Sequence, residues 1–150
     1  MLTPDIAALP VASWAARDCR LFMWVIDSHL QQSFVLAAAW GFRYSTVAFT
    51  WAKQTSTGRA WHFGQGKATR KGTEQCLLFL HGRRGGLLRR SASVRQLVVA
   101  PQRGRGKNGH SVKPDEVYGR IEQLVDGPTS RCSRGNGGRA GMPGATRRRT

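Results

Sequence analysis

Four segments of the chain carry the hydrophobic pattern of β-strands. Residues 20–26 form an almost continuous apolar run, which predicts a strand buried on both faces. Residues 44–51 are rich in β-branched and aromatic side chains and predict a second strand. Shorter apolar runs at residues 74–80 and 96–100 predict two more. Long connections separate the last three strands, and long ordered connections are usually functional.

The segment between the first two strands predicts a helix. Ser28 and Gln31 have the spacing of a capping box, in which each side chain satisfies a backbone N–H group at the start of a helix. Gly41 is placed to end this helix in a left-handed turn. The residues expected on its apolar face are Leu30, Phe34, Ala37 and Ala38.

Residues 114–125 predict a second helix. Pro114 fits the first helical position, and an apolar stripe of Val117, Ile121, Leu124 and Val125 follows it. Lys113 directly precedes this helix, beside N–H groups at the positive end of the helix dipole, where a carboxylate or phosphate can bind. The alternative is a solvated lysine before an ordinary helix.

The order strand, helix, strand with short connections predicts a βαβ unit. Its right-handed crossover indicates an α/β fold with an open parallel sheet, in a single domain over residues 1–126. Ligands of such sheets bind at the carboxyl ends of the strands.

The charge of the chain is strongly basic. Its 24 Lys and Arg residues outnumber 8 Asp and Glu, which gives a formal net charge of +16. A basic protein attracts polyanions, and binding to phosphates weakens with salt. Membrane surfaces are the competing partner, but the sequence has no lipidation motif and no long amphipathic basic helix. We therefore expect a nucleic acid as the partner.

The three cysteines, Cys19, Cys76 and Cys132, are widely spaced and have no metal-binding pattern. They predict buried reduced thiols, with neither a disulfide framework nor a metal site. No uncharged run reaches the roughly 20 residues of a membrane span, and residues 1–10 lack the basic start of a signal peptide. A cytoplasmic protein without membrane association is expected.

The connection at residues 54–73 combines rings, cations and glycines. Such a mixture suits a nucleic-acid-facing surface, where aromatic rings stack on bases and cations follow phosphates. The alternative is a solvated loop with one or two aromatic side chains tucked into the core. His62 has no nearby acid or cysteine that would make it a base or a metal ligand. The rings and cations are Arg59, Trp61, His62, Phe63, Lys67, Arg70 and Lys71.

Four segments in register resemble the family of S-adenosylmethionine-dependent adenine-N6 methyltransferases, which includes the mRNA adenosine methyltransferase and bacterial and phage DNA-modifying relatives. Order and approximate spacing agree as well as identity, and the resemblance covers about residues 3–126. The segments are Cys19–Val25, Trp51–Lys53, Trp61–Gly66 continuing to Arg70 and to Glu74–Leu77, and Val94–Pro101 followed by Lys113–Gly119.

The resemblance implies a Rossmann-like sheet and transfer of a methyl group from S-adenosylmethionine to the exocyclic amine of adenine in a nucleic acid, with DNA favoured over RNA. By the same resemblance, Lys113 would contact the cofactor. Glu74 and its loop would line the pocket for the target adenine, and Trp61, His62 and Arg70 would lie on the substrate side.

The chain departs from the family where the chemistry is done. Members of the family use Asp-Pro-Pro-Trp or a similar motif, whose carboxylate and backbone carbonyl accept the amine hydrogens of adenine. No such motif occurs in these 150 residues. Asp5 does not replace it, because it has no Pro-Pro context and fits the start of a helix. We therefore expect an incomplete methyltransferase, starting at a methionine that is internal in the family, with no catalytic residue and no activity.

Residues 127–150 differ from the rest of the chain. They hold 6 Arg and no acid, and no Leu, Ile, Val or aromatic residue. Such a segment cannot form a core strand and is expected to be a disordered basic tail. A frameshift near codon 128 is the favoured origin, and a genuine nucleic-acid-binding tail is the alternative.

Two other functions stay open. The chain can be a basic nucleic-acid-binding protein without catalysis, which uses the 54–73 connection and the arginine-rich tail. It can also be an unstable remnant with no biochemical role, because strands missing at both ends would leave sheet edges exposed.

Overall fold

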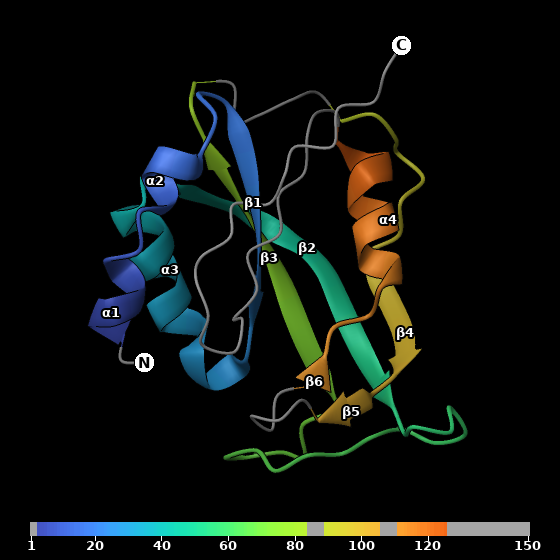
Figure 1. Cartoon of the computed structure of the whole chain (residues 1–150). Helices are drawn as coiled ribbons and strands as arrows, with labels where there is room; N and C mark the ends of the chain where they lie inside the picture. Colours follow the sequence, from blue (N-terminus) through green and yellow to red (C-terminus); the bar gives the residue numbers. More distant parts are fainter. Residues whose placement is uncertain (1–2, 84–88, 106–110, 126–150) are drawn as a thin grey trace.

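The computed structural model describes residues 3–83, 89–105 and 111–125, which form an open four-stranded sheet with helices on both faces (Figure 1). The strands lie in the order β1-β3-β2-β4. Their bounds are Cys19–Val25 for β1, Arg43–Gln54 for β2, Thr73–His81 for β3 and Leu97–Pro101 for β4. The α/β class and the open sheet expected from the sequence are confirmed.

The expected parallel sheet is wrong, because the sheet is mixed. β3 lies between β1 and β2 and runs antiparallel to both. β2 and β4 are parallel neighbours. The connection at residues 55–72 reverses the direction of the chain after β2. Strand β3 therefore lies between β1 and β2, whereas a simple βαβ crossover would place β2 directly beside β1.

β1 is also less buried than a strand with both faces covered. It pairs with β3 alone in the described sheet, and only Val25 at its end is buried, while its other residues are partly exposed. The edge of β4 is shielded on its outer side. There the guanidinium of Arg120 donates to the backbone carbonyls of Arg95 and Leu97 at 2.9 and 2.7 Å. Such contacts block pairing of an edge strand with another chain.

Three helices cover one face of the sheet: α1 (Thr3–Ala7), α2 (Val11–Trp14) and α3 (Leu30–Ala39) (Figure 1). Asp5 lies in the first turn of α1, as expected for a helix start. Packing on this face is apolar. Its buried members are Val25, Leu36, Ala37, Trp40, Phe42, Leu77 and Phe79.

The start of α3 differs from the expectation. A 3₁₀ turn, η1 (Asp27–His29), precedes it, and the Oγ of Ser28 lies 3.0 Å from Nδ1 of His29 without capping the helix. The capping box is therefore wrong. The end is confirmed, because Gly41 has φ +80° and its N–H donates to Ala38.

The buried face of α3 is also rotated from the one expected. Ser33, Leu36 and Ala37 are buried, whereas Phe34 stays partly exposed and packs edge-on against Tyr44 at 5.0 Å between ring centroids. The Oγ of Ser33 donates to the Leu30 carbonyl within the helix, which satisfies its hydroxyl.

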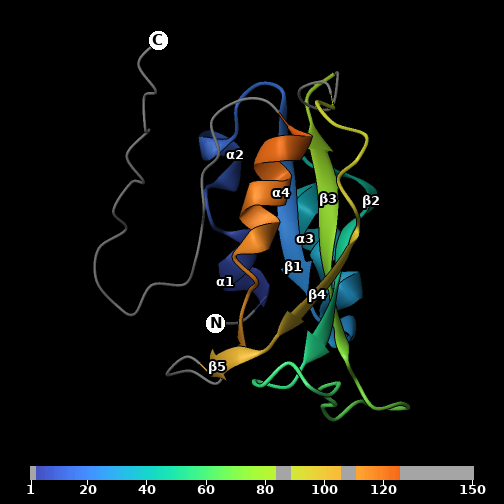
Figure 2. The same ribbon diagram turned by 90° about the vertical axis from the view of Figure 1, so that its right-hand side faces the viewer.

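Helix α4 (Glu116–Leu124) covers the opposite face and lies in front of β1, with its axis roughly along that strand, in the view of Figure 2. The expected stripe is confirmed, because Val117 is buried and Ile121 and Leu124 pack against Phe49, Trp51, Cys76 and Val98. The helix begins at Glu116, so Pro114 precedes the first helical position instead of occupying it.

The carboxyl ends of β1, β2 and β4 meet the amino end of β3 at one edge of the sheet. The 55–72 connection and the short pair β5 (Arg103–Arg105) and β6 (Ser111–Val112) lie at the same end of the molecule (Figure 1). In the described ranges no helix is long and apolar enough to cross a bilayer. The expected tail at 127–150 lies outside the described residues.

Candidate functional site

A cluster of three charged side chains lies at the carboxyl edge of the sheet. Glu74 is 5% exposed and binds two lysines through different oxygens. Lys53 donates to its Oε1 at 2.6 Å, and Lys113 donates to its Oε2 in a short contact. The structure therefore joins Glu74 and Lys113, both predicted site residues, and adds Lys53 to them.

The strands position two of these residues directly. Glu74 faces Trp51 across the β2–β3 ladder, so both side chains point to the α4 face of the sheet. Lys53 lies two residues after Trp51 and shares that face, because side chains of a strand alternate. Lys113 comes from the segment between β6 and α4. Glu74 lies in strand β3, as the predicted strand over residues 74–80 has it, and so does not belong to the loop itself.

The lysines keep Glu74 ionised. Burial alone would raise the pKa of Glu74, but the hydrogen bonds and charges of Lys113 and Lys53 outweigh burial and lower its pKa. With Glu74 ionised, the cluster contains two cations and one anion. The cluster of Lys53, Lys113 and Glu74 therefore has a net charge of one positive unit.

Two tryptophans form the wall next to the lysines. Trp24 and Trp51 meet edge to face at 6.3 Å between ring centroids. Lys53 Nζ lies 5.0 Å from the Trp51 ring, and Lys113 Nζ lies 5.7 Å from the Trp24 ring, so each cation also contacts an aromatic face. The indole N–H of Trp51 donates to the Ala100 carbonyl at 2.9 Å, which fixes the ring.

Cys76 lies below this cluster as an inert thiol. It is fully buried, and burial raises its pKa to about 12 although the charge of Lys113 acts in the opposite direction. The prediction of buried reduced thiols is confirmed for Cys76. Cys19 is free but only partly buried, and Cys132 lies outside the described residues.

The 55–72 connection starts at the same edge. The backbone N–H of His62 donates to the Lys53 carbonyl at 2.9 Å, and Trp61 pairs with Gln54. The Trp61 side chain is 53% exposed. Arg70 lies over the ring of Phe63, 5.7 Å from its centroid, and is directed to its own loop. The structure thus brings Trp61 and His62 next to the cluster through the backbone of the loop, whereas among the described residues Arg70 lies against Phe63 and is not brought into contact with the cluster.

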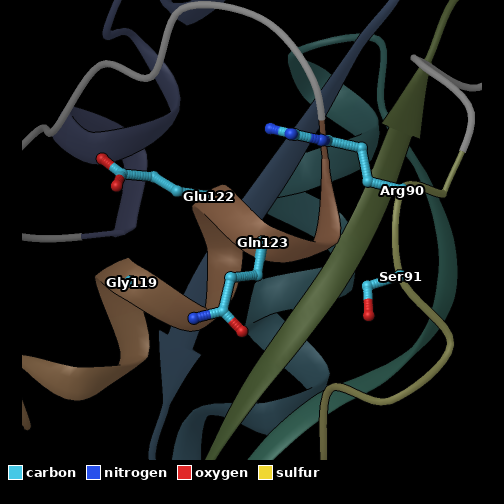
Figure 3. A pocket seen from close by; sticks show the side chains of 5 residues that line it. All are labelled: Arg90, Ser91, Gly119, Glu122 and Gln123. Atoms are coloured by element: carbon cyan, nitrogen blue, oxygen red, sulfur yellow. The ribbon is translucent and has the colours of Figure 1, made fainter.

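Two of the surface hollows among the described residues lie near α4 and near Lys113, and neither of these two is lined by Glu74. The larger, of about 420 Å³, lies between α4 and the segment before β4 and is lined by Arg90, Ser91, Gly119, Glu122 and Gln123 (Figure 3). The smaller, of about 140 Å³, is lined by residues next to Lys113, including Pro114 and Asp115. Pockets that bury a cofactor usually measure about 300–1,000 Å³. The smaller hollow is therefore at most one part of such a pocket.

Sequence reasoning gives no role to Lys53, Trp24 or Trp51, although all three stand in the matched segments. The signal that could have found Lys53 is strand alternation. Trp51 and Lys53 share one face, and a lysine on a mostly buried face needs an acidic partner. The antiparallel return of β3, which the sequence pattern does not reveal, supplies that partner as Glu74.

Comparison with known proteins defines the family. Residues 1–133 match the MT-A70 family. The chain is also similar to the type II methyltransferase M.MunI of Mycoplasma, with 36% identity over 124 residues, which is 80% of this chain. The chain therefore belongs to the MT-A70 family of adenine methyltransferases. It spans 46% of the length of that relative.

Proposed function

We propose that this chain binds S-adenosylmethionine and is part of a methyltransferase that modifies the exocyclic amine of adenine in a nucleic acid, with DNA as the favoured substrate. One observation carries the proposal. This chain, which belongs to the MT-A70 family, holds Lys113, Lys53 and Glu74 together at the carboxyl edge of its sheet, and the two lysines exceed the single carboxylate by one positive charge. Open α/β sheets bind their ligands at this edge.

The cluster fits the anionic end of the methyl donor. S-adenosylmethionine has one carboxylate, and the Lys113 side chain is 27% exposed, so it can reach a ligand as well as Glu74. When bound, the donor supplies a methyl group on a positively charged sulfur. The described residues provide a cation and aromatic walls for one end of the donor. The hollow next to Lys113, of about 140 Å³, is too small for the whole donor, so other residues would have to bind the remainder of it.

The nucleic acid would meet the 55–72 connection. Trp61 and Phe63 are 53% and 55% exposed, and Arg70 stacks on Phe63. Exposed rings beside cations suit stacking on unpaired bases. The net charge of +16 supports a polyanionic partner. Similarity to a type II methyltransferase favours DNA over RNA as that partner. The cytoplasmic location expected from the sequence remains part of this proposal.

We expect these 150 residues alone to transfer no methyl groups. Amine activation needs an acceptor for the amine hydrogens, and the sequence contains no Asp-Pro-Pro-Trp or similar motif. The role proposed for this chain is therefore donor and nucleic-acid binding. The exposed aromatic residues of the 55–72 connection also support the second candidate, a nucleic-acid-binding protein without catalysis.

Calorimetric titration with S-adenosylmethionine separates the two candidates. We expect binding by the wild-type chain and loss of at least about tenfold in affinity in Lys113→Met, because the donor carboxylate loses its cation. 5′-Methylthioadenosine, which has no carboxylate, should bind both chains equally.

Arg43→Met is the matched control. It removes one cation from the opposite end of β2, where Arg43 donates to the Gly82 carbonyl at 2.7 Å, and should leave donor affinity unchanged. A wild-type chain that binds DNA but no S-adenosylmethionine would favour the function without catalysis. Methyl transfer to an adenine-containing oligonucleotide by these residues alone would overturn the expected inactivity.

A further inference from the structure

We propose that Lys53 is a positioning residue that keeps hold of Glu74, so that Lys113 can exchange Glu74 for the anionic group of the methyl donor. This inference rests on the proposed function, because it assigns the exchange to donor binding. It gives the two lysines of the cluster different roles. Lys53 is the fixed partner of the carboxylate, and Lys113 is the exchangeable one.

The positions of the two lysines support these roles. Both backbone polar groups of Lys53, in strand β2, are hydrogen-bonded. Its N–H donates to the Gly72 carbonyl and its carbonyl accepts from the N–H of His62, each at 2.9 Å. Its side chain is 11% exposed. Lys113 lies outside helices and strands, and its side chain is 27% exposed. Lys113 is therefore the lysine that reaches a ligand in solvent.

The carboxylate geometry allows the exchange. Lys53 binds Oε1 and Lys113 binds Oε2, so one contact can open while the other stays closed. Removing the cation beside a buried carboxylate costs much free energy, because the charge is left without a partner. A carboxylate that keeps one ammonium group within hydrogen-bond distance avoids most of that cost. Lys53 thus removes most of the penalty that Lys113 would otherwise incur when it leaves Glu74.

Charge balance points the same way. With both lysines present, the cluster has one cation in excess, which a donor carboxylate neutralises. Without Lys53, Lys113 is the one lysine left to Glu74, so the donor carboxylate would have to compete with Glu74 for it. Loss of Lys53 should therefore weaken donor binding even though Lys113 remains.

The test is calorimetric titration of S-adenosylmethionine into full-length variants. We expect Lys53→Met to weaken binding at least about tenfold, because Glu74 then retains Lys113. The double variant Lys53→Met with Glu74→Gln should recover to within about threefold of Glu74→Gln alone, because the competing carboxylate is gone. Lys53→Arg keeps the cation and should bind like wild type, which covers the case in which Lys53→Met does not fold. Equal affinities of wild type and a folded Lys53→Met would overturn the inference.

A second measurement does not need the donor. Carboxyl carbon NMR of Glu74 should show that its pKa stays below the ordinary value in Lys113→Met, because Lys53 still holds it. A return to the ordinary pKa in Lys113→Met would show that Lys53 does not hold the carboxylate, and would also overturn the inference. If the wild-type chain binds no donor, the proposed function fails, and this titration alone decides whether Lys53 has the holding role.

Discussion

The two faces of the sheet bury different chemistry, although the same strands supply both. On the face covered by α1, α2 and α3 the core is apolar, and the buried hydroxyl of Ser33 in α3 is satisfied within its own helix, with no charged group buried there among the described residues. On the face covered by α4 the apolar core ends in a buried carboxylate with two lysines. The contrast lies within β3, where Leu77 and Phe79 face one way and Glu74 and Cys76 face the other.

This difference separates what stabilises the fold from what serves the site. Buried charges contribute little net stability, because the loss of hydration offsets most of their attraction. The apolar face has no such opposing cost. We therefore expect substitutions on the apolar face to act on folding, and substitutions in the charged cluster to act mainly on ligand binding.

The largest expected effect is that of Phe79→Ala on the apolar face. Phe79 is 1% exposed, and removal of a fully buried ring should lower the free energy of unfolding by about 3–5 kcal/mol. Chemical denaturation measures this loss. Phe79→Leu, which retains most of the volume, should lose much less. If Phe79→Ala weakened donor binding in molecules that remain folded, the proposed separation of the two faces would be wrong.

Glu74→Gln tests the charged face and should cost less. The substitution removes the anion between two lysines, and breaking a buried ion pair costs about 3–5 kcal/mol when the remaining charge is fully buried. Lys113 is partly exposed, so water can solvate it, and we expect a loss of roughly 2 kcal/mol after that screening. Chemical denaturation at neutral pH measures it. A loss as large as that of Phe79→Ala would remove the difference between the faces.

The pH dependence of stability should come from the charged face. The pKa of Glu74 is lowered in the folded state from its ordinary value of 4.5, so the folded protein holds this proton less tightly than the unfolded chain does. The resulting stability is present above pH 4.5 and is lost as the pH falls through the folded pKa. Each unit of lowering contributes about 1.4 kcal/mol.

Denaturation curves between pH 7 and pH 3 would show this component as the difference between wild type and Glu74→Gln. The difference should shrink toward zero at the acid end. A difference that does not change with pH would mean that the two lysines do not stabilise the ionised form of Glu74.

The elements of the fold follow from local patterns, and their arrangement does not. The runs at 20–26, 44–51 and 74–80 predict β1, β2 and β3 to within a few residues, because apolar and β-branched residues report on strands directly. The position of β3 between β1 and β2 depends on which strand the chain pairs with after residues 55–72. That choice is set by long-range packing, which periodicity does not report.

The candidate site divides in the same way. Lys113 and Glu74 come from the family resemblance, and the structure joins them across 39 positions of sequence. Lys53 is missed because its importance comes from its partner across the ladder. At Ser28 the chain forms a 3₁₀ turn where the sequence predicts a capping box, and the neighbouring Asp27 pairs with Lys71 of the loop at 3.3 Å. The local pattern does not report this contact with a distant residue.

The smallest effect on stability is expected for two exposed tryptophans. Comparing their alanine variants also tests whether the cluster of Lys53, Glu74 and Lys113 marks the nucleic-acid-binding edge of the sheet. Trp61 in the loop is 53% exposed, and Trp14 on α2 is 58% exposed. Since neither is buried, replacement of either by alanine should change the free energy of unfolding by less than about 0.5 kcal/mol. Only Trp61 lies beside the lysine cluster, through the backbone contacts of its loop with β2. Trp61→Ala should therefore weaken binding of a fluorescent single-stranded oligonucleotide by about 1–3 kcal/mol, as expected for one stacked base, while Trp14→Ala should bind like wild type. Fluorescence anisotropy at two salt concentrations separates this loss from phosphate binding, because the difference between the variants should persist as salt weakens both. Equal losses in the two variants would indicate that nucleic acid binds through diffuse charge, and that the edge with Lys53 and Lys113 has no special part in its recognition.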